Sequence, residues 1–63
     1  MEVLIDYTNW KGERGFRKIV PDRVYFGSNE WHTKDQWLLE ALDVERNATR
    51  TFAMNDIHSW KST

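Results

Sequence analysis

The stretch Gln36-Trp37-Leu38-Leu39-Glu40-Ala41-Leu42 decides the fold class of this 63-residue chain. Most of its residues are good helix formers, Asp35 before it is a favourable N-cap, and Leu38 and Leu42 have helical spacing. Composition alone therefore favours an α-helix. Alternate positions of the same stretch, beginning with Trp37, also fit a β-strand that is packed on both sides. Taken by itself, the stretch leaves helix and strand open.

The chain before this stretch predicts a β-hairpin. Within residues 2–8, the branched and aromatic side chains of Val3, Ile5 and Tyr7 alternate with those of residues 4, 6 and 8. This period of two indicates a strand. Residues 9–13 are typical of a turn. Arg14–Val20 is expected to form the second strand, with Phe16 and Val20 on one face.

A proline follows the predicted hairpin. Pro21 has no N–H to donate, so it is expected to end the second strand, and Val24–Phe26 is expected to form a short third strand. The remaining elements, in chain order, are expected to be a polar loop at 27–34, a turn at 47–49, a strand at 50–54, a break at 55–56 and a final strand at 57–60.

The composition narrows the class of protein. The chain has no cysteine, which excludes disulfides, thiolate metal sites and cysteine nucleophiles. Four Trp, three Phe and two Tyr in so short a chain argue against disorder. No apolar run approaches the roughly 18 residues that span a membrane, and the acidic start lacks the basic region of a signal peptide. We expect one domain over residues 1–63, cytoplasmic, with no membrane partner.

The charge is distributed unevenly along the chain. A net charge of −1 argues against a dedicated duplex binder. Residues 11–23 nevertheless carry five basic against two acidic side chains, and residues 46–63 carry three against one. The first basic segment is interleaved with aromatic rings, as in Phe16-Arg17-Lys18, which is typical of proteins that bind single-stranded nucleic acid. The alternative is that most of these rings are the core of a small domain.

The chemistry needed for an enzyme is not evident in the sequence. No serine lies in a nucleophile elbow. His32 and His58 each have a carboxylate nearby, Glu30 and Asp56, but the two pairs are far apart in sequence and would have to converge to bind a metal. We therefore predict no catalytic residue, no metal site and no cofactor.

An ordered set of short motifs resembles the WYL domain of bacterial transcriptional regulators. The set consists of Ile5-Asp6-Tyr7, the segment Arg17–Pro21, Trp37-Leu38-Leu39, Arg50-Thr51-Phe52 and Ile57, and the match runs from about residue 3 to residue 60. The resemblance implies an all-β fold, a small Sm-like or SH3-like barrel of five strands, and so changes the expectation for residues 36–43 to a strand. The residues expected to point into such a barrel are Tyr7, Phe16, Val20, Val24, Phe26, Leu39, Phe52 and Ile57.

The resemblance also implies a function. In the family this domain usually follows a DNA-binding winged helix and is thought to sense nucleic acid or a nucleotide. The positions carried over are Tyr7, Arg17 and Arg50, where arginine suits phosphate and tyrosine adds a hydroxyl or a stacking face. The chain departs from the family pattern at Leu38, where the family has tyrosine. It also departs at Asp56, a position that often carries a basic residue in the family. It also has no helix-turn-helix, so it is expected to be a standalone module, a partner of a regulator in trans, or a fragment of a longer protein.

Two hypotheses remain open from the sequence. The first is a non-catalytic ligand-binding and regulatory module whose face of Tyr7, Arg17, Lys18 and Arg50 binds single-stranded nucleic acid or a nucleotide. The alternative is a protein-interaction module or homo-oligomer that buries its spare tryptophans, Trp10, Trp31 and Trp60. Separately, the alternative to an anion site at Arg17 and Arg50 is that these two arginines pair with Asp6, Asp43 or Asp56 on the surface.

Overall fold

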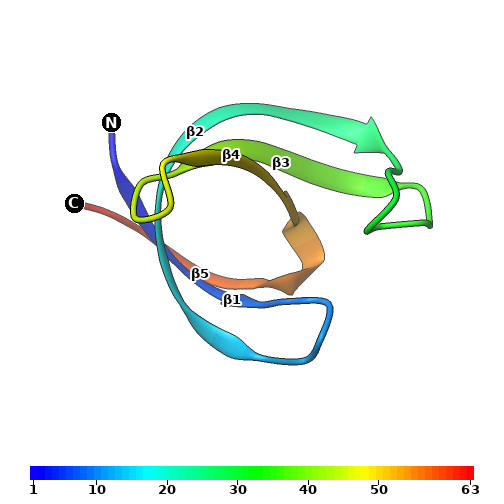
Figure 1. The fold of residues 1–63 in the computed structure, drawn as a ribbon, viewed down its shortest axis with the longest axis horizontal. Coiled ribbons are helices and arrows are strands. Elements are labelled where there is room, and N and C mark those ends of the chain that lie inside the picture. Colours follow the sequence, from blue (N-terminus) through cyan, green and yellow to red (C-terminus); the bar gives the residue numbers. More distant parts are fainter.

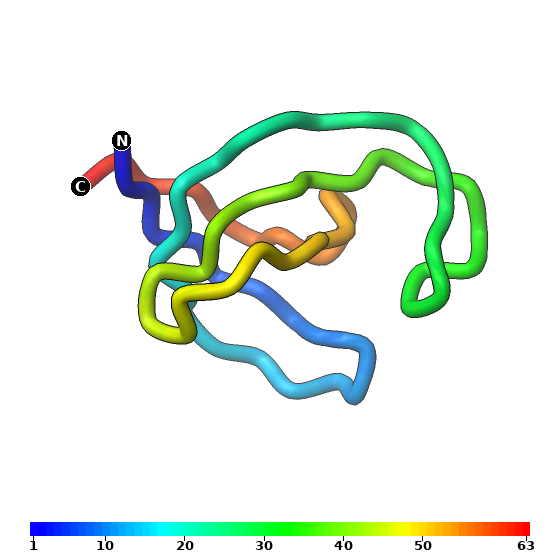
Figure 2. The backbone as a smooth tube through the Cα atoms, turned by 45° about the horizontal axis from the view of Figure 1, so that its top comes forward, coloured from blue at the N-terminus to red at the C-terminus, as the bar shows by residue number.

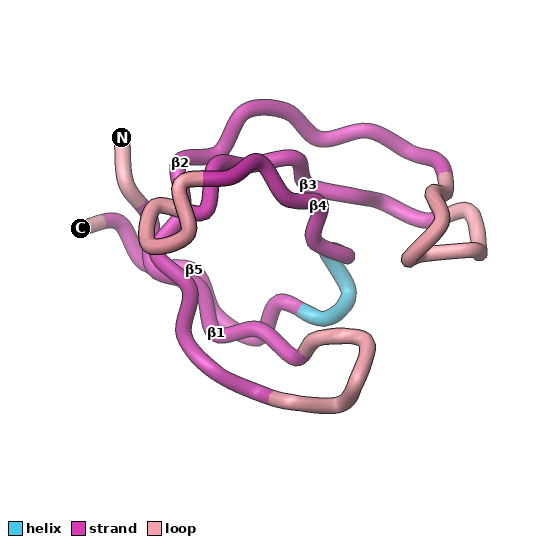
Figure 3. Tube along the Cα trace, viewed as in Figure 1, coloured by secondary structure: helices cyan, strands magenta, loops and turns pink.

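The computed structural model describes residues 1–63 and is mainly β, without an α-helix. Its strands are β1 (Val3–Thr8), β2 (Arg14–Gly27), β3 (Gln36–Asp43), β4 (Ala48–Ala53) and β5 (Ile57–Ser62). A single 3-10 turn, η1 (Met54–Asp56), joins the last two and is the one helical segment in Figure 3. All neighbouring strands are antiparallel, in the order β4-β3-β2-β1-β5. The predicted all-β class is confirmed.

The sheet is curved but is not closed into the expected barrel. Figure 1 shows the strands curling around a common inner side, and Figure 2 shows the same curl from another angle. β4 and β5 each pair on one side only, so the sheet keeps two free edges. The structure contains no helix of the length and apolar character needed to cross a membrane.

The predicted hairpin of β1 and β2 is present. Val3 pairs with Ile19 and Tyr7 with Gly15, so the buried face of β1 meets the same face of β2. The turn is organised by Asn9, whose side-chain oxygen accepts the backbone N–H groups of the residues two and four positions later, both at 2.9 Å. Gly12 within this turn has a φ of 82°, a conformation that favours glycine.

The prediction that Pro21 ends the second strand is wrong. β2 runs unbroken through the proline, so Val24–Phe26 is its second half and not a separate strand. The pairing with β1 ends at Ile19, and the register with β3 shifts between Pro21 and Arg23. A proline is tolerated at such an irregularity, because the ladder needs no N–H from it there.

The deciding stretch is a strand, as the resemblance implied and contrary to its helix-favouring composition. Leu38 is fully buried, and so are Leu39 and Ala41 within the main core. Burial on both faces outweighs the intrinsic helix preference of these residues, because strand stability depends mainly on the packing of side chains. The turn after β3 covers residues 44–47, so the predicted turn at 47–49 ends earlier and β4 begins at Ala48.

The core includes fewer of the expected residues. At the start of β2 it uses the face that carries Ile19 and not the predicted face that carries Phe16. Of the predicted inward residues, Tyr7, Leu39 and Phe52 are buried and Ile57 packs against them, whereas Phe16, Val24 and Phe26 are exposed and Val20 is half-buried. Ile19 is the buried residue of β2, because it lies opposite Val3. The core cluster consists of Val3, Ile5, Tyr7, Ile19, Leu39, Ala41 and Phe52.

Candidate anion-binding site

A single cavity of about 600 Å³ opens beside β4. This volume is within the roughly 300–1,000 Å³ that is usual for small-ligand sites. Its walls come from the end of β1, the β1–β2 turn, the start of β2, the β2–β3 loop, the β3–β4 turn and β4. The lining residues are Tyr7, Asn9, Trp10, Lys11, Glu13, Arg17, Trp31, His32, Arg46, Ala48, Thr49, Arg50, Thr51 and Phe52.

The lining is predominantly basic, with four cationic side chains and one carboxylate, that of Glu13. Arg17 reaches the cavity because it lies opposite the core residue Ile5, on the inner face of the sheet. Arg50 lies opposite Ala41, which is also a core residue. Each of these arginines is therefore placed on the cavity side by the strand that carries it, since residues opposite one another share a face.

Arg46 and Arg50 both lie against a buried carboxylate, that of Asp43. Its Oδ2 is 3.3 Å from Nη1 of Arg46 and 3.9 Å from Nε of Arg50. Its Oδ1 accepts the backbone N–H of Arg46 at 3.3 Å. The Asp43 side chain is almost fully buried, while the two guanidinium-bearing side chains remain about half exposed. The guanidinium groups therefore lie between the core and the open cavity.

Tyr7 forms part of the floor of the cavity. Its ring meets that of Phe52 edge-on, with centroids 4.9 Å apart at 90°. Burial raises the pKa of Tyr7 above the ordinary value of 10.0, and the negative charge of Asp56 acts in the same direction. The nearby Arg17 has the opposite effect on this pKa. Tyr7 is therefore a neutral hydroxyl at physiological pH.

Two tryptophans from different loops stack at the rim. The rings of Trp10 and Trp31 have centroids 6.3 Å apart and an interplanar angle of 27°, and both side chains are largely exposed. Lys11 places its Nζ 5.3 Å from the centroid of the Trp10 ring. Exposed rings beside cations can stack on planar aromatic ligands.

The loop that carries Trp31 is held by its own hydrogen bonds. The backbone N–H groups of Trp31 and His32 donate to Oδ1 of Asn29 at 2.9 and 2.7 Å. Nε2 of His32 lies 3.4 Å from the carbonyl oxygen of Thr51 on β4. The loop thus contacts β4, which also lines the cavity.

The structure brings together three of the four predicted site residues. Tyr7, Arg17 and Arg50 line one cavity, whereas Lys18 is exposed and lies opposite Leu4 on the other face of the hairpin. Arg50 lies close to Asp43, as the surface-pairing alternative predicted, but Arg17 has no ion-pair partner.

Sequence reasoning missed part of the lining. Arg46 and His32 were not predicted as site residues, and Trp31 was predicted only as a spare tryptophan. All three lie in turns or loops, where alternation carries no information on direction. The one available signal was an aspartate, Asp43, at the start of a predicted turn region, because aspartate side chains often bond to nearby backbone N–H groups in turns.

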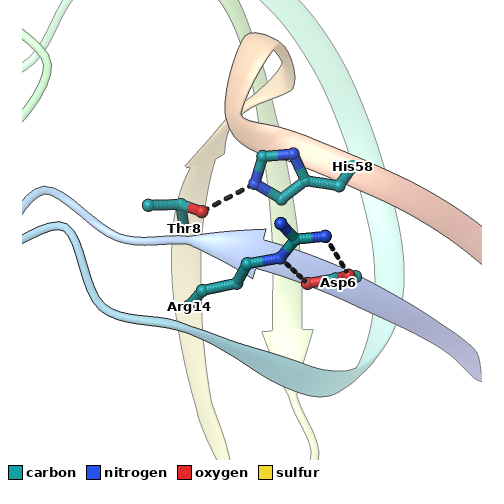
Figure 4. A network of polar contacts seen from close by, with 4 residues as sticks. All are labelled: Asp6, Thr8, Arg14 and His58. Atoms are coloured by element: carbon teal, nitrogen blue, oxygen red, sulfur yellow. Dashed lines mark hydrogen bonds and ion pairs between the residues drawn. The ribbon is translucent and has the colours of Figure 1, made fainter.

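A second polar network lies outside the cavity (Figure 4). Arg14 donates from Nε and Nη2 to the two carboxylate oxygens of Asp6, at 3.0 and 2.8 Å. Beside it, Oγ1 of Thr8 is 2.6 Å from Nε2 of His58. The Asp6 carboxylate is bonded to the guanidinium rather than to the imidazole, so these groups form no nucleophilic triad. The structure contains no group of three or more His, Cys, Asp or Glu side chains placed to bind a metal ion.

The Asp6–Arg14 pair predicts an acid-dependent contribution to stability. The hydrogen bond from Arg14 holds the pKa of Asp6 below its ordinary value of 3.8. The pair therefore stabilises the fold at pH values above that ordinary value, and the contribution is lost as the pH falls through the lowered pKa. Asp6→Asn should lower the melting temperature at pH 7, and its difference from the wild type should shrink as the pH falls below 3.8. Asp22→Asn, at an exposed site without an ion pair, is the control. A loss of melting temperature in Asp6→Asn that stays constant as the pH falls would contradict the prediction.

No protein family, no curated protein and no solved structure matches the chain. The likeness to the WYL domain therefore rests on the ordered motifs of the sequence alone.

Proposed function

We propose that the chain is a non-catalytic, cytoplasmic binding module for a nucleotide or a short single-stranded nucleic acid. The observation that carries this proposal is the cavity beside β4, where Arg17, Arg46 and Arg50 lie near the stacked Trp10 and Trp31. The resemblance to WYL domains suggests that binding serves transcription-related regulation, with a helix-turn-helix regulator as a partner in trans.

The two halves of the lining suit the two halves of a nucleotide. Guanidinium groups form charge-assisted and often bidentate hydrogen bonds with phosphate oxygens. Tryptophan rings can stack on a base of any sequence, with a contribution of about 1–3 kcal/mol per base. Asp56, whose negative charge counts against an anion site, lies in η1 and is not part of the lining, although its charge acts on Tyr7. It therefore does not occupy the place where the phosphate would bind.

The surroundings of the cavity argue against a duplex ligand. Acids outnumber bases outside the lining and bring the net charge of the chain to −1, whereas duplex-binding domains are usually basic. The cavity has the size of a small-ligand site, and its rings are suited to unpaired bases. A mononucleotide or a few single-stranded nucleotides are therefore the ligands that fit best.

A titration followed by proton–nitrogen correlation spectra tests this proposal. The labelled protein is titrated with adenosine 5′-monophosphate and with tetranucleotides of DNA and RNA, at 20 and 300 mM salt. We expect saturable shifts at Arg17, Arg50 and the Trp31 indole. Affinity for the tetranucleotides should fall with salt by a log–log slope of about 0.7 for each phosphate contacted. Binding that is absent, or that does not depend on salt, would contradict the proposal.

A second candidate function, protein interaction or self-association, is favoured by a different surface. Val24, Phe26 and Trp37 lie side by side at the far end of β2 and β3, and each exposes half or more of its surface. The rings of Phe26 and Trp37 are in edge contact, with centroids 5.4 Å apart. Sedimentation over a range of concentrations tests this function, and a monomer of 7.6 kDa throughout would contradict self-association.

A further inference from the structure

The buried carboxylate of Asp43 has an unusual position for a residue at the end of a strand. Its side chain is only 1% exposed, and the two charged side chains within 4 Å of its carboxylate are those of Arg46 and Arg50. Removing a charge from water is unfavourable unless it is paired and hydrogen-bonded. The Asp43 carboxylate meets this need through the N–H and Nη1 of Arg46 and through the nearby Nε of Arg50.

The pairing leaves much of each guanidinium group free. Only Nη1 of Arg46 and Nε of Arg50 face the carboxylate, and neither arginine has another protein partner. An arginine carries five N–H donors in a fixed plane. The remaining donors belong to side chains that line the cavity and are about half exposed.

We infer that Asp43 holds Arg46 and Arg50 as a two-guanidinium fork that binds one phosphate group of the ligand. The inference rests on the proposed function and identifies the phosphate subsite within it. Asp43 is a positioning residue, because it touches the arginines and not the ligand. Its negative charge also offsets the mutual repulsion of the two guanidinium groups, which allows them to share one side of the cavity.

The inference makes a prediction opposite in sign to that of simple charge counting. Asp43 is an acid beside an anion site, so its neutralisation should strengthen phosphate binding if only net charge matters. If the carboxylate fixes the fork, its neutralisation should weaken binding. Glu13 is a matched control, because its carboxylate lines the cavity and forms no ion pair with an arginine. Its Oε1 accepts a hydrogen bond from Nδ2 of Asn9 at 3.0 Å, which glutamine can also accept.

The experiment compares dissociation constants for adenosine 5′-monophosphate and for adenosine in the wild type, Asp43→Asn and Glu13→Gln. We expect Asp43→Asn to weaken binding of the monophosphate about tenfold and to leave adenosine binding unchanged, while Glu13→Gln strengthens binding of the monophosphate. We expect Asp43→Asn to fold, because the asparagine side-chain oxygen can still accept the Arg46 N–H. Urea unfolding verifies this. Tighter or unchanged monophosphate binding by Asp43→Asn would overturn the inference.

A second measurement keeps the inference separate from the proposed function. The nitrogen–proton nuclear Overhauser effect at the Nε–H groups of Arg46 and Arg50 reports their order without any ligand. We expect rigid values in the wild type and mobile ones in Asp43→Asn, with Arg17 unchanged in both. Mobile groups in the wild type would overturn the inference even if nucleotides bind. Rigid groups in a protein that binds no nucleotide would leave the arginine positioning standing while contradicting the proposed function.

Discussion

Replacing Arg17 with alanine is expected to weaken nucleotide binding by tenfold or more without unfolding the domain. Arg17 lines the cavity and has no ion-pair partner, so its guanidinium group is free to bond to the ligand. A hydrogen bond to a charged group contributes about 1.5–3 kcal/mol, and each 1.4 kcal/mol or so corresponds to a factor of ten in affinity. Isothermal titration calorimetry with adenosine 5′-monophosphate measures the loss directly.

Lys18→Ala is the matched control for this variant. Lys18 is the next residue on the same strand and carries the same charge, but it lies on the opposite face. Charges separated by more than the Debye length of about 8 Å at physiological salt interact weakly. We therefore expect Lys18→Ala to change the affinity by less than about twofold. Equal losses for the two variants would show that overall charge, and not the cavity, drives binding.

Among the variants proposed for this chain, Ile19→Ala is expected to cause the largest decrease in the free energy of unfolding. Ile19 is fully buried and lies opposite Val3 in the core cluster. Truncation of a buried isoleucine to alanine costs about 2–5 kcal/mol, whereas the whole free energy of unfolding of a native domain is about 5–15 kcal/mol. Because the core is small, we expect the free energy of unfolding of this domain to lie at the lower end of the second range. Urea unfolding at 25 °C should show a large decrease in the midpoint or a protein that is unfolded throughout.

Phe16→Ala distinguishes the observed face of β2 from the one that the sequence suggested. The Phe16 side chain is larger than that of Ile19, but 64% of its surface is exposed. Surface substitutions usually change stability by about 0.5 kcal/mol or less. If Phe16→Ala instead proved the more damaging of the two, the inner face of early β2 would carry Phe16, and Arg17 could not reach the cavity.

The sequence predicted β1 correctly because its alternation has only one interpretation. Early β2 was ambiguous, since apolar residues occur on both of its faces: Phe16 and Val20 on one, Ile19 on the other. Pairing with β1 decides between them, and that pairing is a property of the whole sheet. The prediction that Pro21 ends β2 failed because it, too, depended on the neighbouring strands. Whether a missing N–H breaks a strand depends on whether a neighbour requires it at that point.

Arg17 and Arg50 were predicted from the resemblance and not from periodicity, whereas the loop residues of the candidate site had no such signal. With Phe16 and Val20 expected to point inward, a period of two would place Arg17 on the outer face. The pairing of Ile19 with Val3 places Arg17 on the core side instead, and Arg50 lies two positions before the core residue Phe52. Trp31 and Arg46 are placed by hydrogen bonds to Asn29 and Asp43 that depend on the folded turns. Such short-range contacts leave no periodic trace in the sequence.

The order of the strands has a consequence for how the chain reaches this structure. β1, β2, β3 and β4 form successive hairpins, so each of their pairings closes a short loop. β5 must return across the whole molecule to pair with β1, and Val3 lies opposite Ser62. The entropy lost on loop closure grows with the length of the loop, and non-local pairings slow folding. We therefore expect docking of β5 to be the late step. The cavity, which is lined only by residues between Tyr7 and Phe52, can take shape before it.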